Sequence, residues 1–152
     1  MLKFAVFLII TSLVCSVKGD KLDDMPWEPG DLITCKLSGV GGFFGFKHYM
    51  IGSDTPRHVI TVLNNKGDGR IEDIHQAQFT RGINRSRCRN RGKGKLTREE
   101  TIERAKRWVG TKFTYNLFRC NCQHWTNDWT KGSSGRWYNN QSLRPSARYC
   151  PI

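Results

Sequence analysis

Several features are missing from this 152-residue sequence, and each absence narrows the classes of protein it can represent. After residue 14, no apolar run approaches the ~20 residues that a membrane-spanning helix needs. No internal repeat is present, which excludes repeat architectures. Paired Cys-x-x-Cys and His-x-x-x-His spacings are also missing, so neither a zinc site nor a cofactor is expected.

Acidic residues are scarce as well. The chain has 13 Asp and Glu against 25 Lys and Arg, for a formal net charge of +12. Much of the positive charge lies in residues 81–98, a run interleaved with Gly, Asn and Ser. Such a run is either a solvated loop or a surface that attracts phospholipid headgroups, bacterial envelopes or sulfated polysaccharide. Nucleic acid is not expected as a partner, because no aromatic and basic recognition module is present.

The first 19 residues have the pattern of a secretory signal peptide. Lys3 supplies the positive start, residues 4–14 form an apolar run, and residues 17–19 are small or compact around the expected cleavage point. The alternative, an uncleaved anchor, would need a longer apolar run. We therefore expect a secreted protein without a transmembrane segment in its mature chain. Its expected parts are an N-terminal arm outside the core (residues 20–28), one domain (29–135) and a polar tail (136–152).

Cysteine parity gives information that does not depend on any motif. Removal of the signal peptide takes Cys15 away and leaves five cysteines: Cys35, Cys88, Cys120, Cys122 and Cys150. In an oxidising compartment four of them should pair, in one of three connectivities, and one should stay free. We predict that Cys122 is the free thiol, with neighbouring Cys120 as the alternative. Two sequons, at Asn84 and Asn140, are candidate N-glycosylation sites.

Hydrophobic periodicity and turn residues predict an α+β fold, in which a small antiparallel sheet packs against helices. Strands are expected at residues 32–37, 48–52, 58–63 and 70–79, with turns at 38–45 and 64–69. Thr97 and Glu100 form a capping box that begins a helix, and Gly110 ends it. A short strand at 112–116 follows. A second helix is expected from the N-cap Asn121 to near Gly132, with Trp125 and Trp129 on its buried face.

The residues Asn121-Cys122-Gln123-His124-Trp125 carry the clearest chemical signal. If Asn121 caps the helix, Cys122 lies in its first turn, where unpaired N–H groups and the helix dipole lower the pKa of a thiol. A thiol nucleophile also needs a base, and the base usually needs a third group that orients it. The motif therefore predicts a cysteine nucleophile with partners elsewhere in the chain.

Two upstream histidines are candidates for those partners. His48 and His58 each begin a predicted strand, and cross-strand pairing is expected to bring His58 beside His48. His124 is two residues from Cys122 and points to another side of the helix, so we expect a structural role for it. A zinc site built from His48, His58 and Cys122 is the alternative that the missing metal-binding spacings argue against.

The order and spacing of these motifs resemble the lecithin:retinol acyltransferase-like family. That family includes the HRAS-like-suppressor phospholipase/acyltransferases and has a permuted papain-like fold. The resemblance covers residues 29–60, with Pro29-Gly30-Asp31-Leu32-Ile33 and the run from Lys47 to Gly52, and residues 96–132 with the cysteine motif. It implies that Cys122 is the nucleophile, His48 the base and His58 the orienting third member.

The sequence departs from the family pattern at three sites, one of them two residues long. Gln123 replaces the usual glutamate of the motif, Trp125 replaces phenylalanine, and Pro56-Arg57 lies where relatives have a plainer hairpin. Loss of the carboxylate removes a negative charge beside the nucleophile, which should favour the thiolate. The tryptophan keeps an apolar side chain at its position.

The expected function is that of a secreted thiol enzyme. Cys122 would attack an ester carbonyl, above all that of a glycerophospholipid, and form a thioester acyl-enzyme. Water would then release fatty acid, as in a phospholipase A1/A2, or an amine or alcohol would accept the acyl group. One alternative is an amidase or peptidase of related fold that acts on bacterial cell wall. The other is a non-catalytic basic binding protein or toxin that keeps the thiol and histidines unused.

Overall fold

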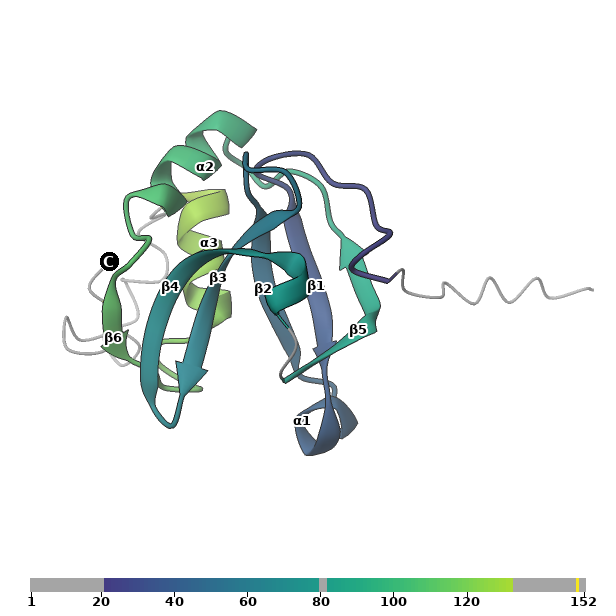
Figure 1. The fold of residues 1–152 in the computed structure, drawn as a ribbon. Coiled ribbons are helices and arrows are strands. Elements are labelled where there is room, and N and C mark those ends of the chain that lie inside the picture. The colour runs from purple at the N-terminus through teal and green to yellow at the C-terminus, as the bar shows by residue number, and fades with distance from the viewer. Residues whose placement is uncertain (1–20, 80–81, 133–149, 151–152) are drawn as a thin grey trace, which may run out of the picture.

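The computed structural model describes residues 21–79, 82–132 and 150. Its strands form a six-stranded antiparallel sheet in the order β5-β1-β2-β3-β4-β6 (Figure 1), so the predicted α+β fold is confirmed. Along the chain the elements are β1 (Leu32–Leu37), α1 (Gly39–Phe43), β2 (Lys47–Gly52), β3 (His58–Asn65), β4 (Asp68–His75), η1 (Gln76–Gln78), β5 (Ile83–Asn90), α2 (Arg98–Lys106), β6 (Lys112–Thr114) and α3 (Cys122–Lys131). The predicted signal peptide, the sequon at Asn140 and all of the predicted tail except Cys150 lie outside the described residues.

The first core lies between the sheet and the helices. Ile51 of β2 and Ile60 of β3 are opposite each other in the register, and both belong to the buried cluster that contains Trp125 and Trp129 of α3. The indole rings are fully buried with centres 6.1 Å apart, which confirms the prediction that they share the buried face of this helix. Burial of these large side chains holds α3 against the sheet.

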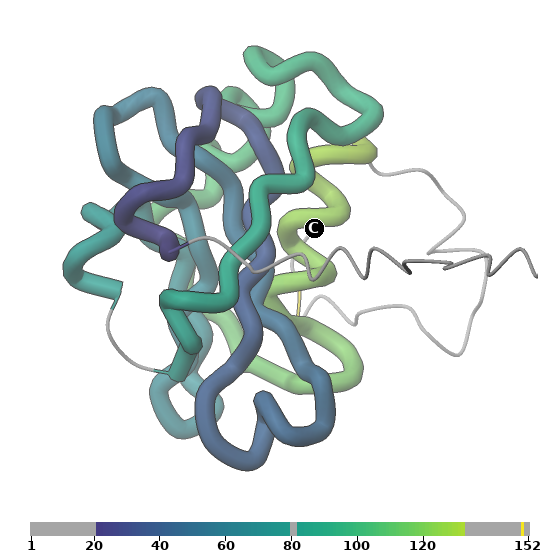
Figure 2. The backbone as a smooth tube through the Cα atoms, turned by 90° about the vertical axis from the view of Figure 1, so that its right-hand side faces the viewer, coloured from purple at the N-terminus to yellow at the C-terminus, as the bar shows by residue number. Residues whose placement is uncertain are grey.

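A second core lies on the opposite face of the sheet. Met50 and Val59 pack there with Leu22 and Met25, which are 0% and 4% exposed. Figure 2 shows residues 21–30 on the side of the strands away from α3. The predicted arm outside the core is therefore wrong at Leu22 and Met25. Their apolar side chains gain more by covering this face than by remaining in water.

Both long helices begin at the predicted caps. The side-chain oxygen of Asn121 accepts hydrogen bonds from the backbone N–H groups of Gln123 (2.8 Å) and His124 (3.2 Å), and α3 is followed by Gly132 with φ 71°. The capping box of Thr97 and Glu100 begins α2. That helix ends at Lys106, and residues 107–110 form turns, so its predicted end is too late.

Three segments contain structure that differs from the prediction. Residues 38–45 hold the five-residue helix α1 instead of a plain turn. The loop interpretation of residues 81–98 is wrong over residues 83–90, because this stretch pairs with β1 as strand β5. The strand predicted to reach residue 79 ends at His75, where η1 begins.

Two disulfides join distant parts of the chain. Cys35 of β1 is bonded to Cys88 of β5, and Cys120 is bonded to Cys150. Cys122 is the free cysteine of the described residues. The predicted division into four paired cysteines and a free Cys122 is thus confirmed, and the structure selects one of the three connectivities. The paired cysteines are 53 and 30 residues apart in sequence. Each disulfide therefore closes a long loop, which reduces the entropy of the unfolded chain considerably.

Candidate active site

Cys122 is the first residue of α3, and 5% of its surface is exposed. Hydrogen-bond donors surround its sulfur: the backbone amides of Tyr49 and Gln123 and the side-chain hydroxyl of Tyr115. Tyr49 is part of β2, and Tyr115 follows directly after β6. The sheet and the start of the helix therefore meet at this thiol.

Burial and hydrogen bonding change the acidity of the thiol in opposite directions. Burial raises the pKa of Cys122, and this outweighs the lowering by the amides of Tyr49 and Gln123 and the hydroxyl of Tyr115. The expected lowering of the pKa at the helix N-terminus is therefore wrong in sign, because the surrounding core excludes the water that would solvate a thiolate. The pKa of Tyr115 is raised by burial and, in second place, by the negative charge that a Cys122 thiolate would carry.

A pH series of alkylation should detect this raised pKa. Native protein without reductant should take iodoacetamide on Cys122 alone among the described cysteines. The thiolate is lost as pH falls through its pKa, so the rate should still be rising above about pH 8.5, the ordinary value for cysteine. Peptide mapping locates the label, and free cysteine in the same buffers is the control. A rate that levels off below pH 7 contradicts the raised pKa, and label on Cys120 contradicts the pairing.

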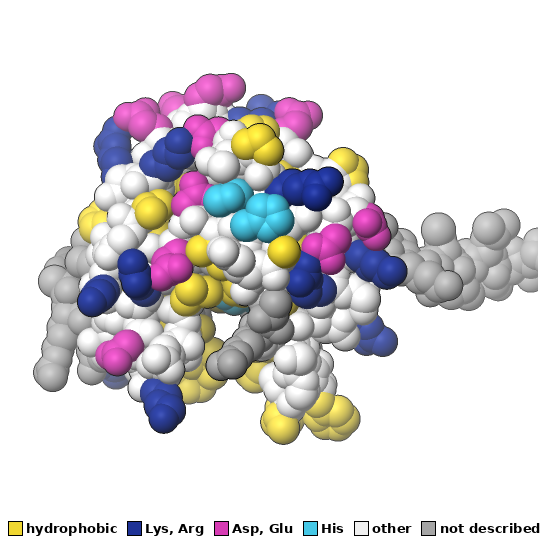
Figure 3. Space-filling view, in the orientation of Figure 1, with side chains coloured by type: hydrophobic (Ala, Val, Ile, Leu, Met, Phe, Trp, Pro, Cys, Tyr) yellow, Lys and Arg dark blue, Asp and Glu magenta, His cyan; other side chains and the backbone are white. Residues whose placement is uncertain are grey.

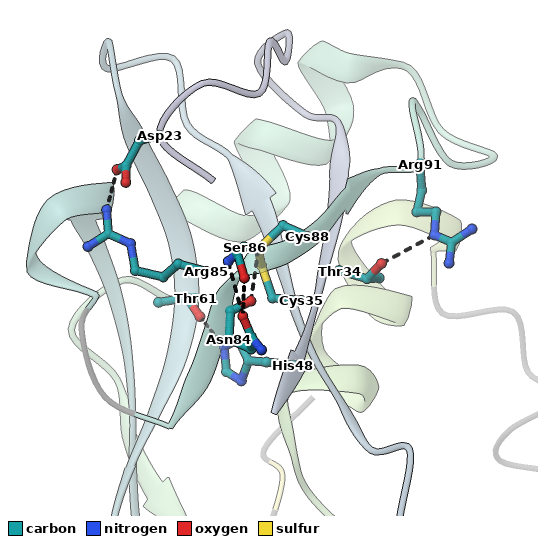
Figure 4. The surroundings of a disulfide bond; sticks show 10 residues. All are labelled: Asp23, Thr34, Cys35, His48, Thr61, Asn84, Arg85, Ser86, Cys88 and Arg91. Carbon is teal, nitrogen blue, oxygen red and sulfur yellow. Dashed lines mark hydrogen bonds and ion pairs between the residues drawn. A yellow bond between two sulfur atoms is a disulfide. The ribbon is translucent and has the colours of Figure 1, made fainter. Parts of the chain in front are cut away.

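His48 lies on the opposite face of the sheet from Cys122. Successive side chains of a strand point to opposite faces. Tyr49 packs in the cluster that contains Cys122, whereas His48 is opposite Cys35, a member of the second core. Figure 4 shows its ring beside Thr61 and near the disulfide of Cys35.

The surroundings of His48 keep its imidazole neutral. Its Nε2 lies 2.7 Å from the Oγ1 atom of Thr61, and the centre of its ring is 5.0 Å from that of Phe79. Burial lowers the pKa of His48 to about 4. At neutral pH the side chain can therefore accept a proton, although a base with so low a pKa accepts it weakly.

His58 has different partners from those predicted. Its Nδ1 lies 3.2 Å from the Oδ1 atom of Asp73, and the other oxygen of that carboxylate accepts a hydrogen bond from the hydroxyl of Ser53 (2.7 Å). The ring of His75, opposite His58 in the β3–β4 register, makes an edge contact at 5.5 Å. This polar group lies at the β2–β3 turn, near the start of β3.

The register of β2 and β3 separates the two histidines. Met50 is opposite Thr61, which puts His48 level with Leu63 and His58 level with Ser53. These levels are five positions apart, or about 16 Å at the rise of a strand. The two side chains also point to opposite faces. The expectation that cross-strand pairing brings His58 beside His48 is therefore wrong.

A cleft connects His48 with the surroundings of the thiol. Pairing between β2 and β3 covers only Met50–Gly52 with Val59–Thr61, so the strands are unpaired beyond it. A cleft of about 1060 Å³ at this end of the sheet is lined by His48 and Tyr115, by apolar side chains that include Val62 and Phe79, and by polar and charged side chains that include Asp68 and Glu72. Figure 3 shows a hollow in this part of the surface. Because the hydroxyl of Tyr115 contacts the sulfur of Cys122, the cleft reaches the group next to the thiol.

The remaining candidate residues have mainly structural contacts. The Nδ1 atom of His124 lies 3.3 Å from the backbone nitrogen of Asn121 in the capping box, consistent with its predicted structural role. The side chain of Asn84 accepts hydrogen bonds from the backbone and hydroxyl of Ser86; glycosylation there stays a prediction.

Over residues 21–79, 82–132 and 150, no group of three or more His, Cys, Asp or Glu side chains is arranged to hold a metal ion. No helix in those ranges is long and apolar enough to cross a membrane.

Sequence reasoning missed two residues of the site. Tyr115 lies in the strand predicted at residues 112–116, and Thr61 in the strand predicted at residues 58–63. Their roles depend on tertiary contacts: Tyr115 reaches Cys122 from the end of β6, and Thr61 of β3 contacts His48 of β2. The local sequence around either residue contains no signal for such a contact.

The structure thus combines a small α+β domain with a free thiol at the start of α3. The model of the lecithin retinol acyltransferase family matches residues 26–135, and the chain belongs to this family. It is a family of acyltransferase-type thiol enzymes. A comparison with curated proteins found no significant match.

Proposed function

We propose that the protein is a secreted thiol enzyme that cleaves or transfers the acyl ester of a glycerophospholipid through a Cys122 thioester. One observation carries the proposal: a free thiol at the start of a helix, with hydrogen-bond donors at its sulfur and a cleft lined in part by apolar side chains beside it. An acyl chain is apolar and would lose contact with water in such a cleft. The two disulfides support an oxidising compartment, as expected for a secreted protein.

The proposed reaction proceeds in two steps. The sulfur of Cys122 bonds to the ester carbonyl carbon, the carbon–oxygen bond to the glycerol breaks, and the leaving oxygen receives the proton that the thiol gave up. Water, or an acceptor amine or alcohol, then attacks the thioester and regenerates the thiol. The backbone amides and the Tyr115 hydroxyl near the sulfur are donors for the negative charge that develops on the carbonyl oxygen.

His48 is the proposed base in this reaction. Its imidazole and the side chain of Tyr115 line the same cleft, and Tyr115 also contacts the sulfur. The proton passes from the thiol through the Tyr115 hydroxyl and water in the cleft to His48, because the imidazole and the sulfur are on opposite faces of the sheet. The raised pKa of Cys122 makes such a base necessary, since little thiolate exists at neutral pH.

Product analysis separates this function from its two alternatives. Purified protein should release fatty acid and lysophospholipid from phospholipid micelles, or transfer the acyl group when an amine is added. The same preparation should release no muropeptides from purified bacterial walls. Muropeptide release without lipid turnover would instead identify a cell-wall amidase or peptidase. If the folded protein turns over neither the phospholipid nor the cell wall, it is a non-catalytic binding protein.

A further inference from the structure

We propose that the end of the molecule around α1 docks onto the surface of an anionic phospholipid membrane and presents the thiol end of α3 to it. This inference rests on the proposed phospholipid substrate and names the surface through which the enzyme reaches it. The docking group is called the α1 tip and consists of Val40, Phe43, Phe44 and Phe46.

Side chains of the α1 tip are exposed although they are apolar. Val40 is 74% exposed, Phe43 87%, Phe44 68% and Phe46 47%, and α1 has no buried residue. The phenylalanine rings contact each other, with centres 5.6 Å apart for Phe43 and Phe44 and 6.5 Å for Phe44 and Phe46. A group of contiguous exposed aromatic residues is unusual for a surface that meets only water and marks an interaction site.

The charge around the α1 tip indicates an anionic partner. Lys36 and Lys47 are exposed and lie directly opposite each other in the β1–β2 register, at the base of the tip. Residues 32–53 contain no Asp or Glu that could offset them locally. Like charges directly opposite each other are unfavourable unless an anion lies between them. Phosphate headgroups would supply that anion while the phenylalanines enter the acyl boundary.

A second exposed loop lies at the same end as the α1 tip. Leu117 is 46% exposed and Phe118 79%, and Arg119 beside them is exposed as well. The carbonyl of Leu117 accepts a hydrogen bond from the side chain of Asn121, the cap of α3. Figure 2 shows this loop and α1 at one end of the molecule, on the side where α3 begins. Two apolar loops with basic neighbours therefore flank the end that carries Cys122.

A lipid surface fits these features better than a second copy of the chain. A twofold contact through the α1 tip would bring each Lys36–Lys47 pair towards its own image, because a symmetric interface repeats the same patch. The like charges would then face each other without compensation. An anionic bilayer places opposite charge at the lysines and apolar chains at the phenylalanines.

Vesicle binding tests the inference. The full-length protein should cosediment with vesicles of phosphatidylcholine and phosphatidylserine more strongly than with phosphatidylcholine alone. Phe43→Ser with Phe44→Ser should weaken this binding about tenfold or more, since burial of one phenylalanine exceeds the ~1.4 kcal/mol of a tenfold change. Lys36→Gln with Lys47→Gln should reduce the salt dependence of binding. Val109→Ser, which removes a 41% exposed apolar side chain between α2 and β6, is the matched control and should bind like the wild type.

The outcomes separate the inference from the proposed function. Cys122→Ala should bind vesicles as the wild type does and lack turnover. Binding without turnover by the wild-type protein would contradict the function and leave the docking surface standing. Turnover of a soluble short-chain ester without vesicle binding would overturn the docking surface alone. Binding as strong as that of the wild type in the double variant Phe43→Ser with Phe44→Ser would also overturn it. A concentration-dependent dimer in sedimentation that the double phenylalanine variant abolishes would assign the α1 tip to a second copy instead.

Discussion

Replacement of Cys122 by alanine is expected to lower phospholipid turnover by at least about 10⁴-fold, because it removes the atom that carries the acyl group. The variant should stay folded, since the change removes one buried sulfur and leaves both disulfides intact. Thermal unfolding measured alongside turnover checks this point. Cys120→Ala, which removes a neighbouring disulfide but not the thiol, is a comparison for damage to the fold. If the Cys122→Ala enzyme keeps more than a few per cent of wild-type turnover, Cys122 is not the nucleophile.

His48→Ala should reduce acylation by about 10² to 10⁴, the usual contribution of a positioned base. We expect a smaller loss for His58→Ala, because His58 contacts Asp73 and His75 and faces away from His48. Tyr115→Phe removes only the hydroxyl at the sulfur and should slow the same step if the proton passes through it. Single-turnover release of the glycerol-containing product measures acylation directly.

The pH profile distinguishes a chemical role of His48 from a structural one. Burial holds the pKa of His48 at about 4, and only the neutral imidazole accepts a proton. Acylation by the wild type should therefore be lost as pH falls through about 4, and His48→Gln should lack this acidic limb. Equal losses in the His48 and His58 variants, with unchanged pH profiles, would argue that neither histidine is the base.

Much of the frame around the thiol could be predicted from local sequence. Asn121 with His124 and Thr97 with Glu100 are capping patterns that act within one helical turn, and both begin the helices observed. The four-residue spacing of Trp125 and Trp129 was enough to predict a shared buried face. Cysteine parity predicted that one thiol is free, because it depends on a count and on the expected compartment, and the motif around Cys122 indicated which one.

Relations between segments could not be predicted in the same way. The relative position of His48 and His58 depends on the β2–β3 turn, where Arg57 adopts φ 60° and the backbone of Ser53 bonds that of His58. A change of register of one residue would reverse the face of every side chain. The sign of the pKa shift of Cys122 depends on burial by distant residues, which outweighs the local effect of the helix start.

The basic run from residue 81 to 98 illustrates the same limit. Its composition suggested a free cationic surface, but Arg98 pairs with the buried carboxylate of Asp31 at 2.9 Å, and Arg85 pairs with Asp23. These arginines hold the segment before β1 against the rest of the domain. Part of the positive charge thus stabilises the fold, and composition alone does not distinguish this use from attraction to an anionic surface.

Intact mass spectrometry of the enzyme after incubation with a phospholipid tests whether Cys122 carries the acyl group. We expect an added mass of one acyl group, located on the peptide that contains Cys122 and removed by hydroxylamine, which cleaves a thioester. The adduct should be absent from Cys122→Ala. Turnover of the phospholipid by an enzyme that never shows this adduct under acid quench, or an adduct that persists in Cys122→Ala, would contradict the account.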